Sequence, residues 1–280
     1  MNKITAPAYA KINLSLEITG KREDGYHDIA SVFQAVSLRD VITLSLGKDG
    51  IKISSDDKSL PTDEKNTCYR AAALFLRELG LSSAGVSIYI EKHIPSMAGL
   101  GGGSSDAASV LKCLNWLYGC PLSDDGLRRL GSAVGADVPF FIGGGTALCR
   151  GTGELITSLK PLKRHWVALI KPECGVSTPE AYKRFDSLEK PPSSHTPNLV
   201  EAINQGLEIA SLLHNDLEDA SGLREISEIK ERLFKYGANG ALMSGSGSCV
   251  FGLFDCYKAC LSACSKLRGS YPFVRICHTI

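Results

Sequence analysis

Apolar and polar residues alternate along the first stretch of the chain, AYAKINLSLEI at 8–18. A period of two predicts a β-strand with one buried face and one polar face. Lys11 and Asn13 lie together on the predicted polar face, and turn-forming residues follow in TGKREDGYHDI. We expect three further strands in this part of the chain, over 32–36, 40–46 and 50–54.

The pattern then changes to a helical period. In NTCYRAAALFLREL at 66–79, a stripe of Ala71, Leu74, Phe75 and Leu79 predicts a helix that stops at Gly80. GVSIYIEKHI at 85–94 alternates again and predicts a strand. A second apolar stripe at helical spacing starts at Ala107 and ends before Gly119, so the glycine-rich segment between them joins a strand to a helix.

The second half of the chain mixes both periods. We expect a helix over 124–134, several glycine turns over 135–156 and a strand near 165. A linker-like segment at 187–198 precedes expected helices at 199–213, 223–236 and 257–267, and strand, glycine turn and strand are expected over 240–254. Because strands and helices mix without a strict alternation, the prediction is an α+β fold in two lobes.

Composition narrows the possible partners. The net charge is +1, from 31 basic and 30 acidic residues without a long run of one sign, which argues against a nucleic-acid face or a membrane-surface helix. Apolar stretches are shorter than the roughly 20 residues that span a bilayer, and the first residues lack a secretory pattern. We therefore expect a cytoplasmic protein with a small-molecule partner; the oligomeric state stays open.

The 10 cysteines do not indicate a metal site, because no Cys-x-x-Cys pair occurs. Cys256, Cys260 and Cys264 recur at helical spacing and are expected to form a buried stripe with Ala263 and Leu267.

The glycine-rich segment IPSMAGLGGGSSDAA, at 94–108, is the first candidate for chemistry. Ser104, Ser105 and Asp106 fall where the helix is expected to begin, and a helix start with preceding glycines can cradle phosphate groups. Simple capping and a flexible connection are the alternative. A Walker loop and a G-x-G-x-x-G dinucleotide loop are both excluded, because their lysine and glycine positions are not met.

The segment resembles the phosphate-binding motif of the GHMP kinases. Four other segments resemble the same family in order: PAYAKINLSLEITGKREDGYHDI, GADVPFF at 135–141, GTGE at 151–154 and LMSGSGSCVF at 242–251. The resemblance implies an ATP-dependent small-molecule kinase with two lobes. Residues 1–157 would form an N-terminal lobe like domain 2 of ribosomal protein S5, and residues 158–280 a ferredoxin-like C-terminal lobe.

By this resemblance, ATP binds along the glycine segment, and Asn66 lies near adenine. Met97 stands where such loops usually carry glycine. Mg²⁺ is expected with ATP, but its ligands are unassigned, and the Ser105 hydroxyl is only a candidate. The expected phosphate-binding residues are Pro95, Ser96, Met97, Ala98, Gly99, Leu100, Gly101, Gly102, Gly103, Ser104 and Ser105.

Phosphoryl transfer needs a group that orients or deprotonates the attacking hydroxyl, and charge that stabilises the reacting groups. Taken alone, Asp137 is equally a turn or capping residue before Val138-Pro139, and Lys11 an ordinary exposed lysine. The resemblance implies that Asp137 is the catalytic base and that Lys11 pairs with it and with the substrate hydroxyl.

The resemblance also implies an acceptor with a cytidine diphosphate moiety, used in isoprenoid synthesis. Aromatic rings stack on a nucleobase, and a histidine can read its edge. Thr178, Asn215 and Asp216 could add polar contacts, and the turn Gly245-Ser246-Gly247 would line the cleft. Another GHMP kinase or a non-catalytic protein of this fold remains the alternative. The expected acceptor-binding residues are Asn13, Tyr26, His27, Phe33 and Tyr182.

Overall fold

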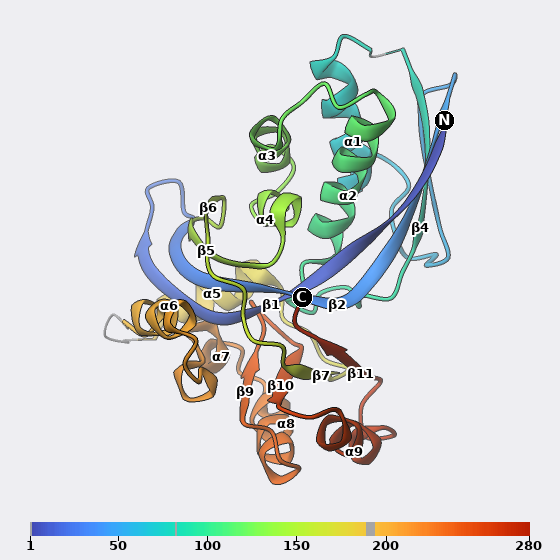
Figure 1. Cartoon of the computed structure of the whole chain (residues 1–280). Helices are drawn as coiled ribbons and strands as arrows, with labels where there is room; N and C mark the ends of the chain where they lie inside the picture. Colours follow the sequence, from blue (N-terminus) through green and yellow to red (C-terminus); the bar gives the residue numbers. More distant parts are fainter. Residues whose placement is uncertain (1, 82, 189–193) are drawn as a thin grey trace. The chain divides into compact units, whose positions relative to one another are not determined.

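The computed structural model describes residues 2–81, 83–188 and 194–280. Its contacts divide the chain into two compact units, each made of three segments (Figure 1). Unit 1 contains Met1–Ala10, Arg39–Ser96 and Gly101–Gly144, and unit 2 contains Lys11–Leu38, Met97–Leu100 and Gly145–Ile280. The lobe boundary at 157/158 stays a prediction, and part of the expected linker, 189–193, lies outside the described residues.

Two long strands, β1 (Lys3–Lys21) and β2 (His27–Gly47), contribute residues to both units. The sequence predicted two strands over 32–36 and 40–46, but β2 is continuous because no glycine or proline interrupts it. The prediction that β1 has a solvent-facing polar side was also wrong. Lys11, Asn13, Ser15 and Glu17 are all buried, because hydrogen bonds to neighbouring segments satisfy this face.

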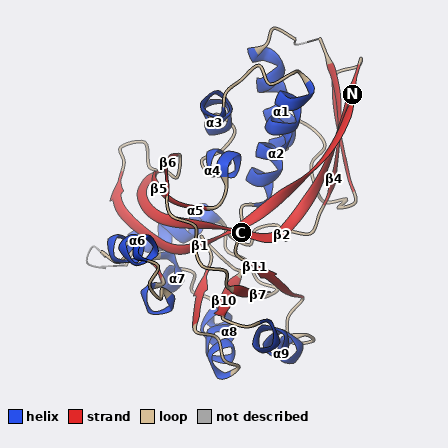
Figure 2. Ribbon diagram, in the orientation of Figure 1, coloured by secondary structure: helices blue, strands red, loops and turns tan. Residues whose placement is uncertain are grey.

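In unit 1, β4 (Gly85–Glu91) pairs in parallel with β3 (Ile51–Ser55) and antiparallel with residues 41–47 of β2. Figure 2 shows the helices of this unit on one side of these strands. In α1 the buried residues are Cys68, Ala71, Ala72, Phe75 and Leu76, so the predicted stripe was shifted, with Leu74 and Leu79 only half-buried. The helices are α1 (Thr67–Glu78), α2 (Gly102–Leu117), α3 (Asp124–Ser132) and α4 (Val138–Gly143).

In unit 2, β5 (Thr146–Gly151) pairs with residues 29–34 of β2 and with β6 (Leu155–Ser158), and β8 (His214–Asn215) pairs with β1. A separate antiparallel sheet has the order β11-β7-β10-β9. Its strands are β7 (Trp166–Lys171), β9 (Gly240–Met243), β10 (Val250–Phe254) and β11 (Phe273–His278).

The helices of unit 2 are α5 (Thr178–Asp186), α6 (Thr196–Gln205), α7 (Leu217–Ala220), α8 (Arg224–Lys235) and α9 (Tyr257–Leu267), with a 3-10 turn η1 (Ala210–Leu212). The helix predicted over 199–213 ends at Gln205, because Gly206 takes a left-handed conformation that closes it. The region 135–156 holds more than glycine turns, since α4, β5 and part of β6 lie there.

The predicted thiol stripe is partly confirmed. Cys260 and Cys264 are buried in α9 with Ala263 and Leu267, whereas Cys256 is exposed and precedes the helix. Among the helices in the described part of the chain, none has the length and apolar character needed to cross a membrane.

Candidate active site

The glycine segment has an alternating backbone. Met97, Gly99 and Gly101 take positive φ angles of 49°, 72° and 70°, and the residues between them do not. Alternation of this kind turns successive N–H groups toward one side of the chain, the geometry of an anion-binding nest. Met97 therefore occupies a left-handed conformation that favours glycine, and its side chain is 75% exposed.

Residues 97–100 are fixed within unit 2. The Ser244 hydroxyl donates to the Gly99 carbonyl (2.9 Å), and the amide of Lys11 donates to the Leu100 carbonyl (3.0 Å). A Cβ at Gly99 would overlap the Ser244 carbonyl oxygen. Glycine is thus required here for its small size as well as for its φ angle.

Helix α2 begins earlier than the sequence indicated. Gly101 occupies the N-cap position and makes no side-chain cap, so Ser104, Ser105 and Asp106 lie inside the helix. The Ser105 hydroxyl donates to the Tyr9 carbonyl (2.6 Å), and Thr67 at the start of α1 donates to the Gly103 carbonyl (2.7 Å). These bonds within unit 1 hold the first turn of α2, whose free N–H groups suit a phosphate.

Lys11 lies in a buried polar group of unit 2. Its ammonium donates to Asn13 Oδ1 (2.5 Å) and lies 4.6 Å from the centroid of the Phe33 ring. The Asn13 amide in turn donates a hydrogen bond to the Ser31 hydroxyl (2.9 Å), and its Oδ1 accepts one from the Ser244 hydroxyl. Three predicted site residues, Lys11, Asn13 and Phe33, are thereby brought together next to the segment that carries Gly99.

Tyr26, His27 and Tyr182 also belong to unit 2. The His27 and Tyr182 rings stack with centroids 4.9 Å apart and an interplanar angle of 22°. His27 is buried, whereas Tyr26 is 66% exposed. The structure thus joins His27 with Tyr182 and leaves the Tyr26 side chain largely open to solvent.

The other two candidates lie at helix starts of unit 1. Asn66 is the N-cap of α1: it accepts from the Cys68 amide (2.9 Å) and donates to the Pro61 carbonyl (2.7 Å). These bonds already use its amide group, so its expected place near adenine stays a prediction. Asp137 occupies the N-cap position of α4, but its side chain makes no capping hydrogen bond to the helix. The structure therefore does not support the alternative that Asp137 is only a capping residue.

The second glycine turn is held by Asn215, whose amide donates to the carbonyls of Met243 and Gly245 (both 2.8 Å). Ser246 is hydrogen bonded to Thr178 at the start of α5 (2.8 Å). A Cβ at Gly245 would lie 3.2 Å from Gly99 Cα and 3.4 Å from Asn13 Oδ1, so this turn packs directly against the Lys11 group.

The described residues contain no group of three or more His, Cys, Asp or Glu side chains that could hold a metal ion. Ser105, the candidate ligand for Mg²⁺, does not fit that role, because its hydroxyl is buried and bonded to the Tyr9 carbonyl.

Two family descriptions match this chain: GHMP kinases N terminal domain over residues 66–145, and GHMP kinases C terminal over residues 198–259. The chain belongs to the GHMP kinase family. Among relatives, a 4-diphosphocytidyl-2-C-methyl-D-erythritol kinase of Clostridium acetobutylicum is 41% identical, with 98% of this chain and 99% of the relative covered. The protein of the same description from Clostridium novyi is 43% identical with the same coverage.

Solved structures agree. A crystal structure of 4-(cytidine 5'-diphospho)-2C-methyl-D-erythritol kinase superposes with a TM-score of 0.84 at 34% identity, covering 99% of both chains. Homoserine kinase from Cytophaga hutchinsonii has a TM-score of 0.79 at 21% identity and covers 100% of this chain and 95% of its own. This second likeness shows the shared fold, which is the two-lobed α+β fold of GHMP kinases.

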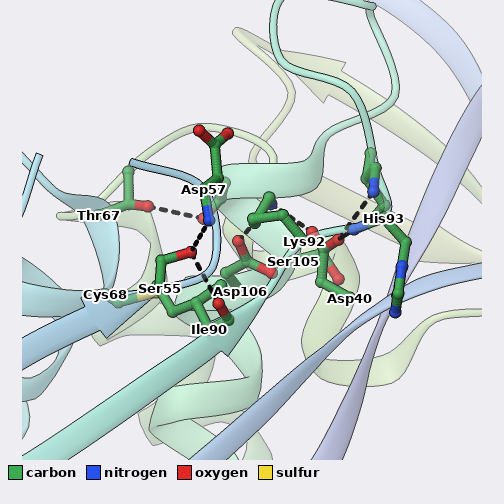
Figure 3. A network of polar contacts seen from close by, with 12 residues as sticks. Asp40, Ser55, Asp57, Thr67, Cys68, Ile90, Lys92, His93, Ser105 and Asp106 are labelled. Carbon is green, nitrogen blue, oxygen red and sulfur yellow. Dashed lines mark hydrogen bonds and ion pairs between the residues drawn. The ribbon is translucent and has the colours of Figure 1, made fainter. Parts of the chain in front are cut away.

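Sequence reasoning missed several polar residues that support the site. Asp186 is hydrogen bonded to His27, and Ser244 bridges Asn13 and the glycine segment. In unit 1, Lys92 lies between Asp40 and Asp106 (Figure 3). Asp40 and Lys92 carry no motif of their own, and a signal was available only for Asp106, which directly follows the glycine and serine run.

Proposed function

We propose that this chain transfers the γ-phosphoryl group of ATP to the 2-hydroxyl of 4-diphosphocytidyl-2-C-methyl-D-erythritol, a step of the non-mevalonate isoprenoid pathway. The observation that carries the proposal is the group around Lys11. A buried lysine, Asn13 and the left-handed Gly99 are linked through Ser244, so a cation lies beside a backbone suited to phosphates. The similarity to kinases described for this substrate, over nearly the full chain, supports the choice of acceptor.

In the proposed reaction, the glycine segment and the start of α2 bind the phosphates of ATP through backbone N–H groups. Asp137 accepts the proton of the acceptor hydroxyl as its oxygen attacks the γ-phosphorus, and the bond from this phosphorus to the bridging oxygen breaks so that ADP leaves. Lys11 stabilises the negative charge that develops on the reacting groups, and its bond to Asn13 holds the ammonium in place. His27, Tyr182 and Tyr26 would bind the cytosine ring.

ADP release tests the proposal. The purified chain is incubated with ATP, Mg²⁺ and one acceptor at a time: the cytidylyl substrate, mevalonate, homoserine or galactose. We expect release with the cytidylyl substrate and a kcat/KM at least about 10²-fold lower with the other three, since a site that hydrogen-bonds a base rejects ligands that lack it. Comparable turnover of another acceptor would make this chain a different GHMP kinase. No turnover with any acceptor would favour a binding protein.

A further inference from the structure

Three charged side chains of unit 1 form a buried cluster. Asp40 comes from β2, Lys92 follows β4 directly, and Asp106 lies in the second turn of α2. The Lys92 ammonium contacts Asp40 Oδ2 and lies 2.8 Å from Asp106 Oδ2. Figure 3 shows the lysine between the two carboxylates, and both aspartates are almost fully buried.

The cluster joins the two chain segments that flank residues 97–100. Asp40 Oδ1 accepts hydrogen bonds from the amides of His93 (2.5 Å) and Ile94 (2.8 Å), which fixes the chain where it leaves β4. Through Lys92, the same carboxylate is linked to Asp106 in the helix that follows. A Cβ at Gly102 would lie 3.0 Å from the Ile94 side chain and 3.5 Å from Lys92 Nζ, so the start of α2 packs tightly on this link.

The charges of the cluster do not balance when both carboxylates are ionised. Asp40 accepts hydrogen bonds from two amides on Oδ1 and from Lys92 on Oδ2, so both of its oxygens have donors. Lys92 donates to one oxygen of Asp106, while the buried Oδ1 has no hydrogen-bond partner among the residues that the structure describes. A proton on Asp106 makes the cluster neutral, and a buried charge without sufficient partners is strongly unfavourable.

The titration of Asp106 follows from this geometry. Burial raises its pKa to about 7; Lys92 opposes the shift and Asp40 adds to it. From α1, Cys68 also faces the cluster, but burial raises the pKa of its thiol well above the usual value, so it stays neutral. Lys92 remains charged, because the two carboxylates offset its burial and raise its pKa.

We infer that the Asp40–Lys92–Asp106 cluster positions the phosphate segment for ATP, and that Asp106 is the protonated member whose neutral form favours nucleotide binding. The inference rests on the proposed use of α2 as a phosphate site. ATP brings further negative charge to the start of this helix, so an ionised Asp106 in its second turn would oppose binding. By reciprocity, bound ATP would hold the proton on Asp106 more tightly.

Binding of a non-hydrolysable ATP analogue, measured by calorimetry at pH 6.0 and 8.5, tests the inference without any acceptor. We expect the Kd of the unmodified chain to be at least about fivefold higher at pH 8.5, a typical coupling between two sites. Asp106→Asn should remove most of this difference, because the amide cannot ionise. Asp125→Asn, an exposed carboxylate on α3, is the matched control and should keep it. Equal pH ratios in the unmodified chain and the Asp106 variant would overturn the inference.

Lys92→Gln provides a second variant. Without the ammonium, Asp106 ionises less readily, so the midpoint of the pH dependence of Kd should move to higher pH. A midpoint that stays in place would refute the role assigned to Asp106. Because neither measurement needs turnover, a wrong acceptor would leave both results interpretable.

Thermal unfolding without nucleotide checks the charge state by itself. An Asp pKa raised from 3.8 to about 7 means that the folded chain binds the proton more tightly than the unfolded chain between these values. The stability contributed by this group is therefore present at low pH and falls as the pH rises through that window. The Tm of Asp106→Asn should rise relative to the unmodified chain between pH 5 and 8. A constant difference would show that Asp106 is ionised throughout.

Discussion

His27 Nε2 lies 2.7 Å from Asp186 Oδ1, while the face of the same imidazole stacks on Tyr182. Lys21 also binds Asp186, and its hydrogen bond, followed by that of His27, keeps the pKa of this carboxyl below its usual value. An ionised carboxylate can only accept, so Nε2 of a neutral His27 carries the hydrogen and Nδ1 is an acceptor. Cytosine presents an exocyclic amine as donor, which matches an acceptor on the ring.

Asp186→Asn should weaken this arrangement, because an asparagine amide can donate to Nε2 and favour the opposite tautomer. We expect the KM for the cytidylyl acceptor to rise about 2- to 12-fold, since a typical hydrogen bond contributes about 0.5 to 1.5 kcal/mol, while the KM for ATP changes little. Steady-state kinetics with each substrate varied in turn gives the answer. An unchanged acceptor KM would mean that Asp186 has only a structural role.

Asp137→Asn tests the proposed base. Loss of a positioned base typically lowers turnover by about 10² to 10⁴, and the amide keeps the size of the side chain. The Kd of ATP should stay nearly the same. Circular dichroism and the Tm confirm folding, and near-normal kcat in a folded variant would remove Asp137 from the mechanism.

The sequence predicted the fold well where local patterns determine structure. The helix at 257–267 and the hairpin of β9 and β10 are confirmed, since apolar spacing and glycine turns specify both. Burial of the polar face of β1 was missed, because the partners of Asn13 are Ser31 and Ser244, 18 and 231 residues away. No local pattern records contacts of that range.

The same reason explains the part of the site that remained hidden. Glycines and family motifs pointed to the glycine segment and Lys11 as candidates, but Asp186 and Lys92 each contact partners that are distant in sequence. Asp106 was expected to start α2, whereas Gly101 takes the N-cap position and places this carboxylate inside the helix. A one-turn displacement converts an apparent capping residue into a buried acid.

Met97→Gly tests the strain at the start of the phosphate segment. A left-handed conformation costs a non-glycine residue about 1 to 2 kcal/mol, and replacement by glycine removes this cost. Glycine also has a more flexible unfolded chain, which offsets about half of the resulting increase in stability. Because the exposed side chain contributes little packing, we expect the free energy of unfolding to rise by up to about 1 kcal/mol. Urea unfolding of both chains measures this difference in the free energy of unfolding. A clear loss of stability would show that the methionine side chain makes favourable contacts.

Tyr26→Ala should raise the acceptor KM about tenfold or more, since stacking on a base contributes about 1 to 3 kcal/mol. The ring is largely exposed, so its removal should leave the Tm nearly unchanged. The KM for ATP should also stay the same, because Tyr26 is remote in sequence from the glycine segment. Impaired ATP binding with normal acceptor binding would assign Tyr26 to the wrong substrate.

Gly99→Ala and Gly206→Ala form a matched pair that separates crowding from backbone strain. Both glycines belong to unit 2 and have a φ of 72°, so alanine meets the same left-handed penalty, about 1 to 2 kcal/mol, at each. Among the described residues, no heavy atom lies within 4 Å of a Cβ placed at Gly206, whereas at Gly99 the Cβ overlaps the Ser244 carbonyl. Relief of that overlap requires the glycine segment or the second glycine turn to move. Ser244 donates a hydrogen bond to Asn13 Oδ1, which also accepts from Lys11. We therefore expect Gly206→Ala to lower stability slightly with normal ATP affinity, and Gly99→Ala to weaken ATP binding by at least about tenfold, since displacements of about 1 Å can have large effects at such sites.

Calorimetric titration with the non-hydrolysable ATP analogue, together with urea unfolding, measures both quantities. Equal behaviour of the two variants would mean that contact with Ser244 does not shape the phosphate segment.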